Sequence, residues 1–575
     1  MPVDKVIVTN LTALRQKYEA AGVKTIQAAV QALIAADKAR GLTTKLIALD
    51  DEAGMKKLKA PPVKDATDPK QNKRAIDGVY KALVPDYLMI LGAIDVVPHQ
   101  DVKNPLYTPN PDGDTDEFAY SDLPYACDAP YSQDVNDFTG PTRVVGRLPD
   151  LTGANNPKYL LGLLQTATKW KSRPRTDYQN YLGISAEKWR DSTSESLQKV
   201  FNTDADLQTS PSRGYKWTSK LINRRLHFIN CHGGDMIPDF YGQSSTDDEE
   251  MPVSHQAAFV ALPKNIIEGT VAAVECCFGG QLYDPSGAEN NQMGMCNTYL
   301  DRKAYGFFGS TTTAYGPFSG NDQADLICQY FLQRVLGGAS LGRAALEARH
   351  KFVEKTTPLN LKNQKTLAQF NLFGDPSITP VAAPTSKLAV GAKIVHLTTG
   401  VAAAGAKSAA NSKAVHQAAA SERAERRQTL RAKGTMLAGM QPAMTKTKTA
   451  PPKNVAASLQ KLARQLNLQH VDTISYRVEA PAQAHIAPQN AMAKGIMKVA
   501  AAKRPETTAF HVFIGTPQST SANMKGIKKG AAKQGATKAG ADGGTSAKKH
   551  PIRKIVVLEA KEVGGNIVIS EGHSK

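Results

Sequence analysis

The chain has few cysteines, few aromatic residues and no long hydrophobic run. Six cysteines among 575 residues are too few and too scattered for a disulfide framework, which favours a reducing compartment. No stretch of about 18 apolar residues is present, which argues against a membrane-spanning helix. The first residues lack a basic segment followed by an apolar one, so no secretory leader is expected. We therefore expect a cytoplasmic protein without a membrane partner.

Basic charge is concentrated toward one end of the chain. The formal net charge is +19, yet residues 1–380 hold 41 Lys and Arg against 43 Asp and Glu, whereas residues 381–575 hold 30 against 9. Three interpretations of this basic region stay open: a regulatory extension that the protein processes itself, a surface for nucleic acid or an acidic partner, and a soluble spacer with a small module. Aromatic residues are scarce there, which argues against binding single strands by base stacking.

Short apolar runs alternate with helical periodicity through the first 380 residues. This alternation predicts an α/β fold with parallel sheets, arranged as two halves over residues 1–150 and 151–382. Helices are expected at 11–39, 73–83, 156–170, 192–201 and 322–352. Strands are expected within 5–10, 44–50, 86–98, 142–150, 181–186, 226–234, 270–280, 305–313 and 370–380.

The composition changes after Pro380. Residues 383–455 form a basic linker rich in Ala and Lys, with a solvated helix expected at 421–434. Residues 456–575 are expected to form a small α+β domain in which "KEVGG" turns a hairpin between two strands. An insert near 518–550 has too few apolar residues to bury and is predicted to be disordered.

Two apolar strands end in residues that can carry nucleophilic chemistry. "LHFINCHGG" ends in His232 and Gly233, and "TVAAVECCFGG" ends in Cys277 followed by glycines. Side chains at the carboxyl ends of neighbouring parallel strands open into one crevice. There an imidazole can activate a thiol, and the amides of Gly233 and Cys277 can form an oxyanion hole. The structural alternative is equally simple, because cysteine is often a small buried hydrophobe and a strand-end histidine can merely cap a hydrogen bond.

Several further segments, in the same order along residues 1–380, resemble the gingipain family of cysteine peptidases. They are "DYLMILGAIDVVP", "YSDLPYA", "VVGRLPD", "GFFGSTTTAYGP" and "FNLFGDPSITP". The His-Gly and later Cys segments resemble the wider clan of caspases, legumains and separases. The resemblance implies a caspase-like catalytic domain with His232 and Cys277 as the catalytic pair.

Adjacent Cys276 and Cys277 require a choice. The family's cysteine is followed three residues later by glycine, and both cysteines meet that spacing. Strand alternation places their side chains on opposite faces, so only one can face the crevice. In the relatives the residue before the nucleophile is small and faces the core, which favours Cys277.

The loop "GISAEKWRDSTSESL" carries two more residues that the resemblance singles out. Glu187 matches a glutamate near the catalytic histidine and would orient His232. Asp191 matches an acidic residue of the primary specificity pocket in arginine-specific members, where a buried carboxylate selects Arg or Lys. An Asp at a helix start is also a common cap. Tyr315 matches an aromatic residue that would form a wall of the pocket.

These observations predict a cysteine endopeptidase that cleaves peptide bonds after Arg or Lys through a thioester acyl-enzyme. Its partner is a protein or peptide substrate with a basic residue at the cleavage site, and a regulatory partner would bind the basic C-terminal region. Under the first of the three interpretations, self-processing would occur there, around "ERRQTLRAK" or at exposed sites such as Lys503–Arg504. The alternative is a catalytically silent scaffold whose basic tail binds an acidic partner or nucleic acid.

No cofactor is expected to be required, and no metal site is assigned. "NPDGDTDE" lacks a complete calcium-binding loop pattern. Because relatives bind calcium structurally, the resemblance leaves room for a structural calcium ion.

Overall fold

A computed structural model describes residues 3–211, 217–246, 251–382, 388–390, 393–395, 409–479, 507–517, 552–563 and 566–575. Within these residues no helix is long and apolar enough to cross a bilayer. All six cysteines are among them, and each is buried and free of a disulfide. The disordered insert expected near 518–550 and the cleavage site at Lys503–Arg504 lie outside the described residues.

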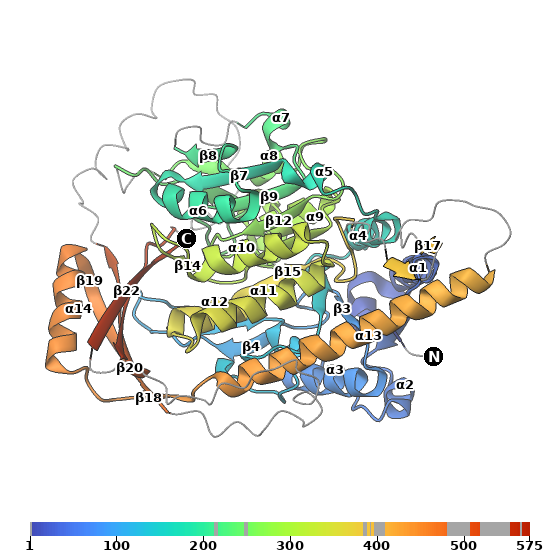
Figure 1. The fold of residues 1–575 in the computed structure, drawn as a ribbon, viewed down its shortest axis with the longest axis horizontal. Coiled ribbons are helices and arrows are strands. Elements are labelled where there is room, and N and C mark those ends of the chain that lie inside the picture. The colour runs from blue at the N-terminus through green and yellow to red at the C-terminus, as the bar shows by residue number, and fades with distance from the viewer. Residues whose placement is uncertain are drawn as a thin grey trace, which may run out of the picture.

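One twisted ten-stranded sheet forms the centre of the molecule (Figure 1). Its order is β2-β1-β3-β6-β15-β13-β12-β9-β7-β8. The sequence pattern predicted nine of these strands and missed the short edge strand β8. The strands are β1 (Lys5–Thr9), β2 (Thr44–Ala48), β3 (Tyr87–Leu91), β6 (Val145–Leu148), β7 (Tyr181–Ala186), β8 (Leu207–Ser210), β9 (Leu226–Asn230), β12 (Val271–Val274), β13 (Gly306–Ser310) and β15 (Phe370–Phe373).

The α/β prediction is confirmed, and the two expected halves run in opposite directions. Strands β1, β2, β3, β6 and β15 are mutually parallel, as are β13, β12, β9, β7 and β8. The halves join where β13 and β15 pair antiparallel. Although β15 comes last in this part of the chain, it lies beside β6 of the first half. The halves therefore share one continuous sheet, and the domain boundaries themselves stay predictions.

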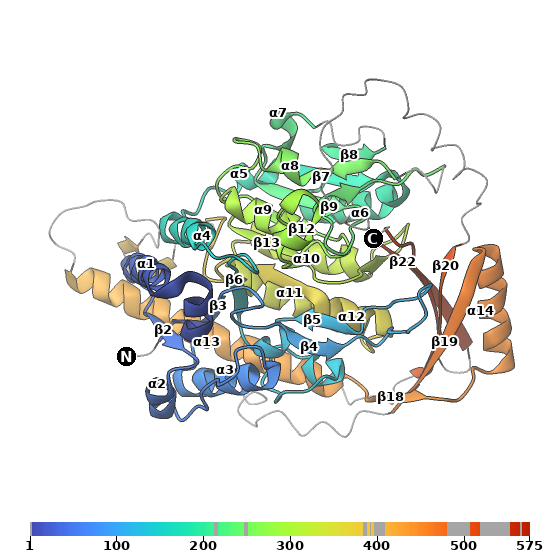
Figure 2. The ribbon, with the colours of Figure 1, turned by 180° about the vertical axis from the view of Figure 1, so that it is seen from behind.

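Helices cover both faces of this sheet, each over its own apolar core. Figure 1 faces α10 and α11, and Figure 2 faces α4 and α9. The helix predicted over 322–352 is two helices, because Gly338 has φ +82° and Ser340 caps a new N-terminus. The helices are α1 (Leu11–Ala39), α2 (Glu52–Lys57), α3 (Pro69–Leu83), α4 (Lys158–Lys169), α5 (Thr176–Gln179), α6 (Arg190–Phe201), α7 (Ser219–Ile222), α8 (Ala257–Val260), α9 (Met295–Asp301), α10 (Gln323–Leu336), α11 (Leu341–Thr356) and α12 (Leu361–Gln369).

Smaller elements complete this part of the chain. Strands β4 and β5 form one hairpin-like pair and β10 and β11 another, both antiparallel. Their bounds are β4 (Gln100–Lys103), β5 (Phe118–Ser121), β10 (Phe240–Tyr241) and β11 (Val253–His255). The 3-10 turns are η1 (Leu123–Ala126), η2 (Val135–Phe138), η3 (Glu187–Trp189), η4 (Pro285–Gly287) and η5 (Glu289–Asn291).

Segments that resemble the gingipains are held together by buried polar contacts. Arg147 of "VVGRLPD" grips Asp122 of "YSDLPYA" with two guanidinium nitrogens and donates to the Val97 carbonyl of "DYLMILGAIDVVP" at 2.6 Å. Burial opposes ionisation, yet the Arg147 guanidinium holds the pKa of Asp122 well below its ordinary value. Asp375 of "FNLFGDPSITP" pairs with the buried Lys5 ammonium. These motif residues contribute to the stability of the fold rather than to the chemistry of the site.

The phenol of Tyr299 joins two buried histidines in the core. It donates to Nδ1 of His227 and accepts from Nε2 of His255, each at 2.8 Å. We expect Tyr299→Phe to lower the free energy of unfolding by about 3 kcal/mol, because one imidazole acceptor and one donor lose their partners in the dry core. Urea unfolding measures this, with Tyr120→Phe, whose ring is 47% exposed, as the control. Equal effects of both substitutions would contradict the prediction.

The expected solvated helix is instead a 32-residue helix, α13 (Ala409–Met440), that lies along the first half. Arg423 pairs with Asp4 at 2.9 Å, and Arg427 pairs with Asp86. A Cβ on Gly434 would lie 2.2 Å from the Pro141 carbonyl oxygen, so the helix backbone touches the core directly. Basic residues in this region therefore bind acidic residues of the first half rather than only water.

The C-terminal residues form a six-stranded antiparallel sheet in the order β14-β22-β21-β20-β19-β18. The expected hairpin is confirmed as β21 and β22, although its two turn glycines lie outside the described residues. Strand β14 belongs to the catalytic part, so β22 reaches back to it (Figures 1 and 2). The elements are β14 (Tyr315–Gly316), β16 (Leu388–Val390), β17 (Lys393–Val395), β18 (Met444–Thr447), α14 (Lys453–Gln465), β19 (Leu468–Val478), β20 (Thr507–Pro517), β21 (Val556–Val563) and β22 (Asn566–Ser574).

Candidate active site

His232 and Cys277 follow neighbouring parallel strands, as the sequence predicted. Strands β9 and β12 pair in register, so the two strand ends lie at the same edge of the sheet. The backbones come so close there that a Cβ on Gly233 would lie 1.9 Å from the Cys277 carbonyl oxygen. Only glycine fits at this position.

The two adjacent cysteines face opposite sides of the sheet. Cys276 packs into the core that also contains Cys231, whereas Cys277 belongs to the other core. The Ala314 amide donates to the Cys277 sulfur at 3.2 Å. Burial raises the pKa of the Cys277 thiol to about 12, although the Ala314 amide favours the thiolate. The Cys277 thiol is therefore protonated while it is buried in this way.

His232 is held on two sides. Its backbone exchanges two hydrogen bonds of 2.8 Å with Tyr241, and its ring lies edge-on to Trp189 with centroids 4.5 Å apart. Nε2 meets the Gln243 side-chain oxygen at 2.9 Å, so this nitrogen carries the proton. Burial lowers the pKa of His232 to about 3, although the hydrogen bond with Gln243 acts to raise it. Among the described residues Nδ1 has no hydrogen-bond partner, which leaves it available as a base.

Gln243, not Glu187, is the side chain that meets His232. The Glu187 carboxylate accepts from the Ser245 amide at 3.1 Å, while the neighbouring Lys188 amide donates to the Gln243 carbonyl at 3.2 Å. Glu187 thus secures the loop that presents Gln243. An amide orienter fixes the ring tautomer without adding a negative charge, so it stabilises the imidazolium less than a carboxylate would.

Lys575 occupies this edge of the sheet. The Cys277 amide donates to the Lys575 carbonyl oxygen at 2.9 Å, and the Lys575 amide donates to the Ala314 carbonyl at 3.0 Å. The same Ala314 contacts the Cys277 thiol. The carbonyl of Lys575 is therefore bonded to the Cys277 amide, one of the two expected oxyanion donors.

The Lys575 side chain is fully buried in an acidic pocket. Its ammonium lies 2.5 Å from Glu275 and 2.9 Å from Asp325, and 5.5 Å from the centre of the Trp189 ring. A Cβ on Gly316 would lie 2.1 Å from the lysine Cε, so Gly316 leaves room for the side chain. We name Glu275, Asp325, Trp189 and Gly316 the lysine pocket.

Electrostatics in the lysine pocket favour a bound cation. Burial and the neighbouring Asp325 carboxylate raise the pKa of Glu275 well above its ordinary value, while the Lys575 ammonium opposes the rise. Burial alone would lower the pKa of Lys575, but Asp325 and Glu275 outweigh it and raise the pKa. The Lys575 ammonium therefore lies between two acidic side chains in a buried site.

A sequence model of peptidase family C25 matches residues 2–381. The chain belongs to peptidase family C25. This is the gingipain family of the caspase-like clan, so the protein is a cysteine peptidase. No curated protein matches it in sequence.

Solved structures similar to this C25 peptidase differ strongly from it in sequence. One described as a protease has 12% identity and a TM-score of 0.41, and the alignment covers 99% of this chain and 97% of that one. A chain of the Saccharomyces cerevisiae separase–securin complex has 11% identity and a TM-score of 0.26, with 42% of this chain and 14% of that one covered.

The two residues expected in the specificity pocket of this C25 peptidase make other side-chain contacts. The Asp191 side chain is 79% exposed at the start of α6 and faces Arg190 at 3.8 Å, so the expectation of a buried carboxylate there is wrong. Tyr315 is buried, but its hydroxyl donates to Asp114 at 2.8 Å and it packs in a separate core cluster. Its contribution to the site is its backbone, which pairs with Ser574.

Sequence reasoning missed the two pocket carboxylates. Glu275 offered one signal, because it is a charged residue at the end of an otherwise apolar strand. Asp325 offered none, since it lies on a helix 50 residues further along the chain. The acidic residues of "NPDGDTDE" have another role: the buried Lys365 ammonium lies 2.5 Å from Asp114 and 3.0 Å from Asp116. In the described part of the chain no cluster of three or more His, Cys, Asp or Glu is placed to hold a metal.

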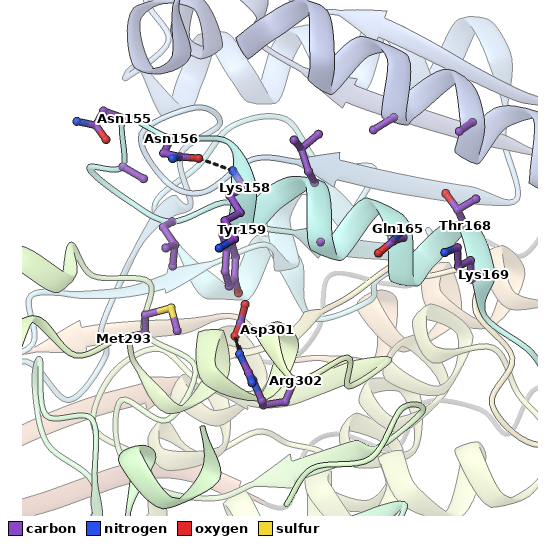
Figure 3. A pocket seen from close by; sticks show the side chains of 16 residues that line it. Asn155, Asn156, Lys158, Tyr159, Gln165, Thr168, Lys169, Met293, Asp301 and Arg302 are labelled. Carbon is purple, nitrogen blue, oxygen red and sulfur yellow. Dashed lines mark hydrogen bonds and ion pairs between the residues drawn. The ribbon is translucent and has the colours of Figure 1, made fainter. Parts of the chain in front are cut away.

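A separate hollow of about 920 Å³ lies between α1, α4 and the end of α9 (Figure 3). Tyr159 and Gln165 of α4 face it from one side, and Asp301 and Arg302 from the other. Neither member of the catalytic pair and no residue of the lysine pocket lines it. The hollow is therefore separate from the β9–β12 edge where His232 and Cys277 lie.

Proposed function

We propose that this C25 peptidase is an endopeptidase that cleaves after a basic residue, with lysine preferred over arginine. The observation that carries the proposal is the position of Lys575. A lysine side chain fills the acidic pocket while its own carbonyl meets the Cys277 amide. This is the arrangement that a substrate residue adopts when its carbonyl is presented to the nucleophile.

Each residue of the site has a role in the proposed reaction. Nδ1 of His232 takes the proton of the Cys277 thiol, and the sulfur attacks the carbonyl carbon of the substrate lysine. The Cys277 amide donates to the oxyanion, and the Gly233 amide is the proposed second donor. His232 then protonates the leaving amine. Water hydrolyses the thioester, which releases the new carboxylate and restores the thiol.

Lysine is favoured because the pocket is closed and ends at two carboxylates. The ammonium already meets both of them, and Gly316 and Trp189 bound the side chain. A guanidinium is larger and planar and needs a wider fork of acceptors. We expect the lysine-to-arginine ratio of kcat/KM to be about tenfold, the scale of a steric misfit in a fitted pocket.

Reporter peptides with Lys, Arg, Leu or Asp at the cleaved position test the proposal in reducing buffer. The full chain and its Lys575→Ala variant are both assayed, because Lys575 fills the pocket of the former. Turnover in the order Lys, then Arg, with Leu and Asp near background is expected. Equal turnover of Lys and Leu peptides would refute the specificity. Absence of turnover in both chains would instead favour the silent scaffold.

A further inference from the structure

The last residues of the chain lie in the site as an extended peptide. Strand β22 pairs antiparallel with β14, with Ser574 opposite Tyr315 and His573 opposite Gly316. The Lys575 amide continues this ladder to Ala314. Adding a strand to an exposed edge is a general way to bind a peptide, because main-chain hydrogen bonds hold it and side-chain pockets read it.

Residues next to Lys575 hold the segment in register. The Ser574 hydroxyl accepts from the Ile555 amide at 2.8 Å and donates to the Arg553 carbonyl at 2.9 Å. The His573 ring stacks on Phe318 with centroids 3.7 Å apart and planes 25° from parallel. Ser574 is therefore held by residues 553 and 555, and His573 is held by Phe318.

The segment covers the groups that a substrate needs. Lys575 is fully buried, Cys277 is only 4% exposed, and the Cys277 amide is already bonded to the Lys575 carbonyl. A substrate lysine would require the same pocket, the same edge of β14 and the same amide. The segment is tethered to the enzyme, so it competes at an effective concentration on the order of millimolar.

We propose that residues 573–575 inhibit the peptidase in cis by occupying its substrate site. This inference rests on the proposed function of the same site. The rest of β22 stays paired with β21 along its length, and Lys362 of α12 contacts Ser570 at 3.1 Å. Activation therefore requires only that residues 573–575 leave β14 and the lysine pocket, while the hairpin remains in place.

Replacement of Lys575 tests the inhibition by turnover. Lys575→Ala and Lys575→Glu are expected to raise kcat/KM for a Lys reporter at least about tenfold, because each removes the ammonium that anchors the segment. Lys561→Ala, a lysine of neighbouring β21, is the matched control and should leave the rate unchanged. A synthetic peptide "NIVISEGHSK" should inhibit the Lys575→Ala variant again, whereas the same peptide ending in alanine should not.

Alkylation of Cys277 gives a second readout that needs no catalysis. Iodoacetamide labelling, located by mass spectrometry, should be at least about tenfold faster in Lys575→Ala than in the full chain or in Lys561→Ala. Faster labelling without turnover in any chain would support the seating of the segment and refute the proposed function. Turnover with equal rates in the full chain and Lys575→Ala would keep the proposed function and overturn the inhibition. Equal labelling in all chains would likewise overturn it.

Discussion

Replacing Cys277 by alanine is expected to lower kcat for a Lys reporter by about 10⁴-fold or more, the scale of removing a catalytic nucleophile. The Cys277 sulfur lies beside Ala314, whose carbonyl binds the Lys575 amide, and the Cys277 amide binds the Lys575 carbonyl. No other thiol in the described residues has this relation to a peptide carbonyl. Steady-state turnover in the Lys575→Ala background measures the effect without competition from the C-terminal residues.

Cys276→Ala is the matched control, because it removes the same atom one residue away. Its side chain faces the opposite core, so the substitution leaves a small cavity and costs on the order of 1 kcal/mol of stability. We expect at least half of the turnover to remain. If Cys276→Ala abolished turnover and Cys277→Ala did not, the assignment of the nucleophile would be wrong.

Asp325→Asn is expected to lower kcat/KM for the Lys reporter by about 10²-fold or more. Removing one partner of a desolvated charge pair costs about 3 kcal/mol, since the remaining charge stays buried without compensation. Glu275→Gln should cost less, because burial raises the pKa of Glu275 and so opposes its ionisation, and glutamine retains an acceptor oxygen for the ammonium. Reporter assays of both variants in the Lys575→Ala background separate the two carboxyl groups.

Two comparisons make this test specific to the lysine pocket. Asp191→Asn removes an acidic group of the same kind that is exposed and paired with Arg190, so it should leave the Lys reporter unaffected. Asp325→Asn should not lower the turnover of a Leu reporter any further. Loss of the Lys reporter in Asp191→Asn but not in Asp325→Asn would place the specificity pocket where the family resemblance implied it.

The position of His232 and Cys277 at one edge of the sheet was predictable because its signal is local. An apolar run that ends in His-Gly or Cys-Phe-Gly-Gly indicates both a strand and the residue that directly follows it. Neighbouring parallel strands place such residues at the same edge of the sheet. Opposite faces for Cys276 and Cys277 follow from the two-residue period of a strand. Glu187 and Asp191 were placed by analogy with relatives. In the structure, Gln243 contacts His232, and Glu275 and Asp325 contact the Lys575 ammonium.

The sequence by itself determined the α/β class, most strands of the sheet, the His232–Cys277 edge and the basic charge of the C-terminal region. Periodicity, strand ends and composition are properties of neighbouring residues, so they can be read without the fold. Only the tertiary structure decided that β15 joins the two halves, that α13 packs on the first half, and that Lys575 fills a pocket made by Glu275 and Asp325. These contacts join residues up to 419 positions apart, and no local pattern specifies which distant charges will meet in a buried site.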